Sequence, residues 1–277
     1  MQTEEEFRNI ACVQLKLKNC KNETQFYNLI KSSLKNLKQS TDLICFPENL
    51  NLCLLFAKPD INPKSFRSFY ENLIDKILSF LNLSFLLNVQ DLHTQKNIVL
   101  NVFQKIAKEY NTNIITGSFY EEKPDGVYNV IYAINRTGTI VDSACKKDLV
   151  GLEKGLKIKS KAENRVVNFD FAKVGLSVCF DLNDKEYCSK YKCDILVAPS
   201  NGFRPFPGYP FDKNRETPQI QRAEENNYMV LRPYCAGWLG PLYFSGRSMI
   251  VGKNGEMLGQ STSRNENEVL LVSVVFW

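Results

Sequence analysis

The sequence has very little histidine, because His93 is the only one in 277 residues. Imidazole is the commonest metal ligand and a frequent catalytic base, so other side chains must fill those roles here. A zinc site would need cysteine ligands alone, and Cys188 and Cys193 have no second pair at a suitable spacing. We therefore expect no metal site, and we expect His93 to be a surface or helix residue.

The sequence also lacks a long apolar run and a block of one charge. The longest apolar stretch, ILSFLNLSFLLNV at 77–89, is shorter than the ~20 residues that cross a bilayer, and Asn82 and Asn88 interrupt it. The opening MQTEEEFRN is acidic and polar, the opposite of a signal peptide. The net charge of +5 comes without the basic stripe that follows a phosphate backbone. We expect neither a membrane nor a nucleic acid as partner.

The nine cysteines are an odd number and lie scattered along the chain, several of them within apolar, strand-like runs. This distribution suits reduced thiols better than a disulfide framework. The sequence therefore predicts a cytoplasmic protein.

Length and composition favour one domain over residues 1–277, because 44% hydrophobic residues can fill one large core. Apolar, β-branched runs predict strands, and apolar residues at helical spacing predict helices. Strands are expected at 9–17, 42–46, 113–119, 128–135, 138–145, 165–171, 173–180, 194–200, 227–233 and 268–277, and helices near 26–37, 65–110, 184–191 and 215–226. A hairpin is expected at Asn254-Gly255. This alternation predicts an α/β fold with a mixed sheet and helices outside.

Three side chains with useful chemistry follow predicted strands. Glu48 follows the run DLICF, Lys146 follows GTIVDSAC, and Cys179 ends KVGLSVC. In α/β folds the ligand crevice lies beyond the carboxyl ends of strands. A carboxylate there can take the thiol proton, the thiolate can attack a carbonyl carbon, and the ammonium can stabilise the oxyanion. Taken singly, each residue has an ordinary alternative: a solvated acid, a surface lysine or a small buried thiol.

Six motifs in order resemble those of the nitrilase, or carbon-nitrogen hydrolase, superfamily. They are FPENL, CKKDLVGLE, KVGLSVCFDLNDKE, DILVAPSNG, QRAEENNYMVLRP and FSGRSMIVGKNGEML. The resemblance covers nearly the whole chain and implies a four-layer α-β-β-α sandwich, with subunits paired in a homodimer or a higher homo-oligomer. It implies Glu48 as general base, Lys146 as the oxyanion-stabilising lysine and Cys179 as nucleophile.

The resemblance assigns two further roles. Glu153, to within a residue or so, is the second glutamate that the family places shortly after the lysine. The backbone N–H of Phe180 is a second oxyanion donor. Lys147 competes with Lys146 for the lysine position, and matching Leu149 to the family's leucine favours Lys146.

Two positions depart from the family pattern. Asp148 stands in place of the usual histidine, and we expect its charge to hold Lys146 more firmly protonated. Asn183 stands where an arginine that could meet a carboxylate often occurs. The run CFD after the nucleophile resembles the amidase and carbamoylase branches more than the nitrilases proper.

The function implied is hydrolysis of a small linear amide or N-carbamoyl compound through a thioester, which releases ammonia or an amine and needs no cofactor. Candidate substrate-binding residues are Asn201 and Arg204 in the loop 201–211, and Trp238, with Tyr243 beside it. A rigid surface loop, or packing against a neighbouring subunit, would explain these residues equally well. Two alternatives stay open: nitrile hydrolysis or acyl transfer at the same site, and a binding or assembly protein that keeps the fold without catalysis.

Overall fold

The computed structural model describes residues 6–37, 41–55, 89–204, 216–239 and 242–276. The strands are β1 (Arg8–Lys16), β2 (Leu43–Cys45), β3 (Asn113–Lys123), β4 (Gly126–Ile134), β5 (Ile140–Cys145), β6 (Arg165–Asn168), β7 (Lys173–Leu176), β8 (Ile195–Val197), β9 (Phe203–Arg204), β10 (Met229–Arg232), β11 (Cys235–Leu239), β12 (Leu242–Ser245), β13 (Met249–Val251), β14 (Met257–Gln260) and β15 (Glu268–Val274). The helices are α1 (Glu23–Ser33), α2 (Leu52–Leu55), α5 (Val89–Tyr110), α6 (Gly151–Gly155), α7 (Lys185–Ser189) and α8 (Thr217–Asn226), with a 3₁₀ helix η2 (Cys179–Asn183).

These strands form two sheets over the described ranges. The larger has the order β5-β4-β3-β2-β1-β11-β12-β9, and the smaller β14-β13-β10-β8-β7-β6. The edge of β1 away from β2 is shared, because β15 pairs with its first part and β11 with its last two residues. Strands β1, β2 and β3 are parallel neighbours in one sheet, and β7, β8 and β10 in the other. In each sheet the carboxyl ends of these three strands therefore share one edge.

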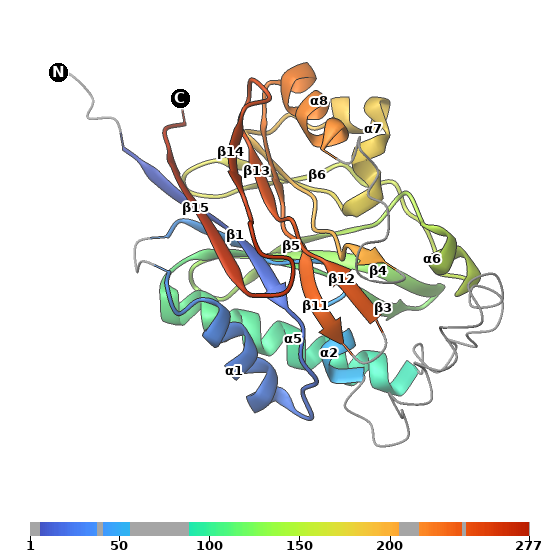
Figure 1. Ribbon diagram of the computed structural model, residues 1–277. Coiled ribbons are helices and arrows are strands. Elements are labelled where there is room, and N and C mark those ends of the chain that lie inside the picture. The colour runs from blue at the N-terminus through green and yellow to red at the C-terminus, as the bar shows by residue number, and fades with distance from the viewer. Residues whose placement is uncertain (1–5, 38–40, 56–88, 205–215, 240–241, 277) are drawn as a thin grey trace.

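Alternation of side chains along the strands explains how the layers pack. On β1, Ala11 and Val13 belong to the core that includes apolar residues of α1 and α5, whereas Ile10 and Cys12 belong to the core between the sheets. Figure 1 shows α1 and α5 together on one outer face and α7 and α8 together on the other. The order is therefore α-β-β-α.

The smaller sheet repeats this pattern from the opposite side. On β8, Ile195 and Val197 face the core between the sheets, and Leu196 packs with residues of α7 and α8. Both faces of both sheets are thus covered, which accounts for the nearly continuous apolar runs at these strands. The predicted α/β class and the four-layer sandwich are confirmed.

Most predicted elements are present with shifted ends. The predicted strand 173–180 is shorter, because β7 ends at Leu176 and the chain turns into η2. The prediction missed α6 and the hairpin of β11 and β12. The predicted helix 65–110 is confirmed from residue 89 onward, and its first part, with almost all of the apolar stretch 77–89, lies outside the described residues.

Three smaller features of the chain complete this description. His93 is exposed on α5, as predicted. All nine cysteines are unpaired thiols, as their distribution predicted. In the part of the chain that the structure describes, no helix combines the length and the apolar character needed to span a membrane.

Candidate active site

Glu48 lies in a turn whose backbone is hydrogen-bonded to strand β3. The N–H of Phe46 donates to the carbonyl of Ile115 at 3.0 Å, and the N–H of Asn49 donates to the carbonyl of Ser118 at 2.5 Å. Between those two acceptors β3 is irregular, and Gly117 has a φ of 73°. Asn49 has a φ of 60°, a conformation that asparagine tolerates better than most residues. The run DLICFPENL at 42–50 therefore directs its carboxylate inward instead of into solvent.

The carboxylate of Glu48 is fully buried and has three donors. Its Oε1 accepts from Lys146 Nζ and from Asn129 Nδ2, both at 2.9 Å. Its Oε2 accepts from the backbone N–H of Asn201 at 3.0 Å. Behind the turn, the thiol of Cys235 at the start of β11 donates to the carbonyl of Glu48 at 3.3 Å. Both sheets thus contribute to the position of this one side chain.

Lys146 follows β5 and lies between two carboxylates. Its Nζ is 2.9 Å from Glu48 Oε1 and 2.7 Å from Glu153 Oε2, and its side chain is 1% exposed. Burial acts to lower the pKa of Lys146, but Glu48, Cys179 and Glu153 together outweigh it and raise that pKa well above its usual value. The ammonium therefore stays charged. It uses two of its three N–H donors on carboxylates, which leaves one for a further acceptor.

Asn129 on β4 is a site residue that the sequence analysis missed. Its Nδ2 donates to Glu48 Oε1 and to Glu153 Oε1, each at 2.9 Å, so one amide bridges the two carboxylates. Glu153 in α6 also accepts from the N–H of Val150 at 3.0 Å. The available signal was a single amide in the otherwise apolar run YNVIYAI.

The structure places Asp148 against Lys147, and its expected effect on Lys146 stays a prediction. Both of its carboxylate oxygens lie 3.0 Å from Nζ of Lys147, which also pairs with Asp184 at 2.6 Å. This group is partly exposed, and the groups that act most to raise the pKa of Lys146 are Glu48, Cys179 and Glu153. Lys146, and not Lys147, is the lysine that reaches Glu48.

Cys179 lies three residues past the end of β7, at the start of η2. Its φ of 50° is unusual for a residue other than glycine or asparagine. Backbone strain of this kind is common where a turn presents a reactive group. The residue is partly exposed. Burial of the thiol and the charge of Glu48 raise its pKa to about 11, against the opposing effect of Lys146. At neutral pH the resting group is a thiol beside a carboxylate.

Asp181 ties the cysteine turn to the lysine turn. Its Oδ2 accepts from the N–H of Val178 at 3.1 Å, and its Oδ1 accepts from the N–H groups of Lys147 at 3.2 Å and Asp148 at 2.7 Å. One buried carboxylate therefore fixes the backbone on both sides of the site. Burial raises the pKa of Asp181 to about 7.

The structure places two of the predicted substrate-side residues close to the cluster. Phe180 is the second residue of η2, in the first turn, where backbone N–H groups have no partner within the helix, and the residue is 47% exposed. Asn201 contacts the cluster through its backbone N–H to Glu48, while its side chain accepts from the N–H of Phe203 at 2.9 Å. Its observed contact is thus to a glutamate of the cluster.

Arg204, Tyr243 and Trp238 form a row across three neighbouring strands. Tyr243 on β12 is the register partner of Arg204 on β9 and of Trp238 on β11. The two rings lie 5.1 Å apart, and Trp238 is 49% exposed. Register partners share a face of the sheet, so these candidate wall residues gather on one surface. The rest of the predicted wall loop, 205–211, lies outside the described residues.

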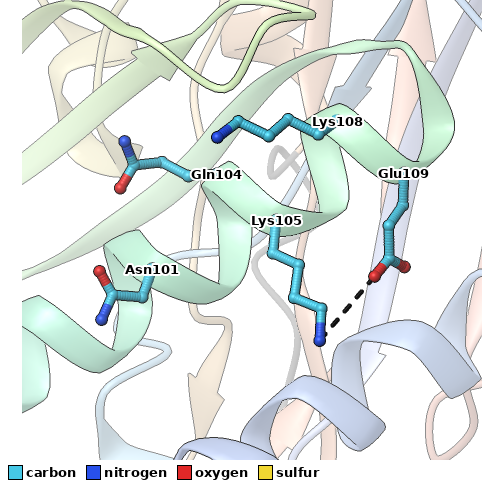
Figure 2. Close-up of a pocket in the computed structure, with 5 residues that line it drawn as sticks. All are labelled: Asn101, Gln104, Lys105, Lys108 and Glu109. Carbon is cyan, nitrogen blue, oxygen red and sulfur yellow. Dashed lines mark ion pairs between the residues drawn. The ribbon is translucent and has the colours of Figure 1, made fainter.

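A hollow in the surface lies elsewhere, on the outer side of α5. Figure 2 shows its lining residues, Asn101, Gln104, Lys105, Lys108 and Glu109, with the ion pair between Lys105 and Glu109 at 3.9 Å. They belong to one exposed helix face and include none of the residues around Cys179. We assign no function to this hollow.

Comparison with known proteins agrees with the geometry. The family model for carbon-nitrogen hydrolase matches residues 9–276. This chain belongs to that family. Its similarity to the 2-oxoglutaramate amidase of Bacillus subtilis is 26% identity over 161 residues, 57% of this chain and 60% of the relative. The deaminated glutathione amidase of Dictyostelium discoideum is 29% identical over 198 residues, 65% of this chain and 66% of the relative. The chain thus aligns with less than two thirds of each of these carbon-nitrogen hydrolase relatives.

Solved structures share the fold of this carbon-nitrogen hydrolase. A mutant of an amidase from Nesterenkonia sp. AN1, in complex with butyramide, superposes with a TM-score of 0.72 at 18% identity, covering 99% of this chain and 93% of that one. Nit3 of Saccharomyces cerevisiae, a member of branch 10 of the nitrilase superfamily, gives 0.69 at 17% identity, covering 98% and 90%. At such identities these likenesses support the four-layer architecture.

Proposed function

We propose that this protein hydrolyses the C–N bond of a small linear amide or N-carbamoyl compound through a thioester on Cys179. The observation that carries the proposal is the buried group of Glu48, Lys146 and Glu153 beside Cys179, a residue that is itself partly exposed. Two carboxyl groups and one ammonium meet in this buried group, and burying such groups costs free energy. The arrangement places a proton acceptor near the thiol. The names of the relatives, which are amidases, support the same class of substrate.

In the first half of the reaction, Glu48 takes the proton of Cys179 and the sulfur attacks the amide carbon. The developing oxyanion accepts from the third N–H of Lys146 and from the N–H of Phe180. Glu48 then gives the proton to the leaving nitrogen, the C–N bond breaks, and ammonia or an amine departs. The acyl group remains on sulfur as a thioester.

In the second half, Glu48 takes a proton from water and the hydroxide attacks the thioester carbon. The C–S bond breaks, the carboxylic acid leaves, and Glu48 returns the proton to Cys179. We assign Glu153 and Asn129 the task of holding Lys146 and Glu48 in place, because Glu153 pairs with the ammonium and the Asn129 amide donates to both carboxylates. No step in this sequence requires a cofactor.

The pH profile of alkylation tests the role of Glu48 without a known substrate. Cys179 is labelled with iodoacetamide and quantified by peptide mapping against the other eight cysteines. If Glu48 takes the thiol proton, the rate of alkylation of Cys179 in the wild type stays nearly constant between pH 6 and 9. The proton then moves from the thiol to the carboxylate, and none is exchanged with the solvent. In Glu48→Gln the rate at pH 7 falls and then rises about tenfold per pH unit as the thiol itself ionises. Labelling that merely follows exposure, with the same profile in both proteins, contradicts the proposal.

Turnover then separates the remaining alternatives. A panel of linear amides, N-carbamoyl compounds and the corresponding nitriles is scored by release of ammonia, with Cys179→Ala as control. We expect release from amides or carbamoyl compounds only with the wild type. Activity on the nitriles alone favours nitrile hydrolysis, and a folded wild type that labels selectively but turns over nothing favours the binding protein.

The setting of the enzyme is also a proposal. Nine free thiols favour the reducing cytoplasm, because such compartments keep cysteine reduced. A homodimer is expected from the family resemblance, and light scattering of the purified protein tests it.

A further inference from the structure

The smaller sheet carries a group of polar side chains of its own at its strand ends. Strands β7, β8 and β10 are parallel neighbours, and Cys179, Ser200 and Arg232 all lie at or just beyond their carboxyl ends. Ser200 is fixed there by its own N–H, which donates to the carbonyl of Pro233 at 2.9 Å, and by its bridge to Tyr234. The three side chains are thus brought to one edge by rigid strands.

The hydroxyl of Ser200 connects Arg232 to the thiol. Arg232 Nε donates to Ser200 Oγ at 3.0 Å, so the hydroxyl accepts on that side and its own proton is free to point elsewhere. One acceptor is the carbonyl of Ala198, at a long 3.4 Å. The other is the sulfur of Cys179, whose pKa the Ser200 hydroxyl acts to lower. Because a thiolate accepts a hydrogen bond more strongly than a thiol does, the hydroxyl proton turns to the sulfur when the sulfur becomes negative.

Arg232 is a buried cation with neutral partners. It is 8% exposed, its Nη1 donates to Gln219 Oε1 at 2.6 Å, and its guanidinium lies 5.3 Å from the ring of Tyr234. Among the described residues no carboxylate forms an ion pair with it. A buried charge without a counter-ion is costly. An anion that forms nearby during the reaction would offset this cost. The charge of Arg232 acts to lower the pKa of the Cys179 thiol, which favours the thiolate.

We propose that Ser200 is a further catalytic residue, whose hydroxyl donates a hydrogen bond to the Cys179 thiolate, and that Arg232 is a positioning residue that orients this hydroxyl and adds positive charge behind it. The inference rests on the proposed role of Cys179 as nucleophile. Lys146 and Phe180 stabilise the oxyanion on the substrate, whereas Ser200 and Arg232 stabilise the negative charge on the sulfur. It acts when sulfur carries charge: before attack, and again when the thioester breaks.

The test compares Ser200→Ala with two matched variants in the Glu48→Gln background, which lacks the proposed base for the thiol. Ser200→Thr keeps the hydroxyl. Ser177→Ala removes a buried hydroxyl two residues from Cys179 that has no hydrogen-bond partner in the described structure. The rate of alkylation of Cys179 is measured from pH 6 to 10. We expect Ser200→Ala to be about tenfold slower below the pKa of the thiol, Ser200→Thr to recover most of that loss, and Ser177→Ala to match the parent.

Coincident profiles for Ser200→Ala and the parent, with both proteins folded by circular dichroism, overturn the inference. If Ser200→Ala does not fold, Arg232→Lys and Arg232→Met decide: the inference requires the methionine variant to be slower than the lysine variant, and equal rates refute it. Failure of the proposed function looks different. In that case Cys179 of the wild type is not labelled ahead of the other cysteines, whatever stands at position 200.

Discussion

Gly117 and Pro47 approach so closely that a Cβ on Gly117 would overlap the carbonyl oxygen of Pro47. The positive φ of Gly117 and the irregularity of β3 at this point make room for the turn that carries Glu48. The position of the proposed base therefore depends on the absence of a side chain on a neighbouring strand.

Gly117→Ala should destabilise the protein by about 2–4 kcal/mol, because it combines a disfavoured φ with an overlap on rigid backbone. Urea unfolding measures this, and alkylation of Cys179 should lose its flat pH profile as Glu48 is displaced. Gly151→Ala in α6 is the control, since a Cβ there has nothing within 4 Å, and its stability should change by less than about 1 kcal/mol. Equal effects of the two substitutions would refute the assigned role of Gly117.

Asn129→Leu should remove the amide that bridges Glu48 and Glu153. Each carboxylate loses one donor, and a lost hydrogen bond to a buried charged group costs about 1.5–3 kcal/mol. Turnover should fall with no change in the oligomeric state. Asn129→Asp, of the same shape, should be worse, because it places a third carboxylate beside two others. Denaturant titration of both variants tests the order, and a milder aspartate variant would contradict it.

Lys146 and Lys147 are adjacent in the chain and opposite in environment. Lys146→Met should cost about 3–5 kcal/mol, because it leaves two buried carboxylates without their shared cation. Lys147→Met should cost less than about 1 kcal/mol, because its pairs with Asp148 and Asp184 are partly exposed. Urea unfolding of both variants gives the comparison, and only Lys146→Met should abolish turnover.

Cys188 predicts how stability responds to alkaline pH. Its side chain is buried, and burial raises its pKa from 9.0 to about 12. Below pH 9 both folded and unfolded states carry the neutral thiol, so the contribution to stability is complete. Between pH 9 and 12 only the unfolded state ionises, so stability is lost, by about 2–3 kcal/mol at pH 11. The free energy of unfolding of Cys188→Ala should fall less steeply over this range, and parallel slopes would exclude the effect.

Glu48, Lys146 and Cys179 were accessible from the sequence because each directly follows a run with a clear strand pattern. Ser200 and Arg232 occupy similar positions, yet they were read only as the ends of strands. Their importance depends on β7, β8 and β10 being neighbours, which no local pattern states. Sheet order depends on the whole chain. Residues that come together only because their strands are neighbours therefore cannot be identified from local sequence patterns.

Two other residues show a different limit of the sequence. Asn201 was predicted to bind substrate, and that stays a prediction. Its observed contact to Glu48 uses the backbone N–H, a group that every residue except proline has and that carries no signal in the sequence. Asp148 was expected to act on Lys146, and its carboxylate pairs with Lys147, which also pairs with Asp184. Residue type predicts which chemical group is present. The rotamer and the backbone conformation decide which neighbour that group contacts.

The pairing of β1 has a consequence for synthesis. Ile10 pairs with Leu43 of β2 on one side and with Val272 of β15 on the other. During synthesis β15 leaves the ribosome long after β1 and β2. At ~5–20 residues per second, the interval is roughly ten seconds to a minute. Over that time one edge of β1 is an open template for other chains. The nascent polypeptide is then most in need of a chaperone, and slow translation near residues 268–274 would prolong its exposure.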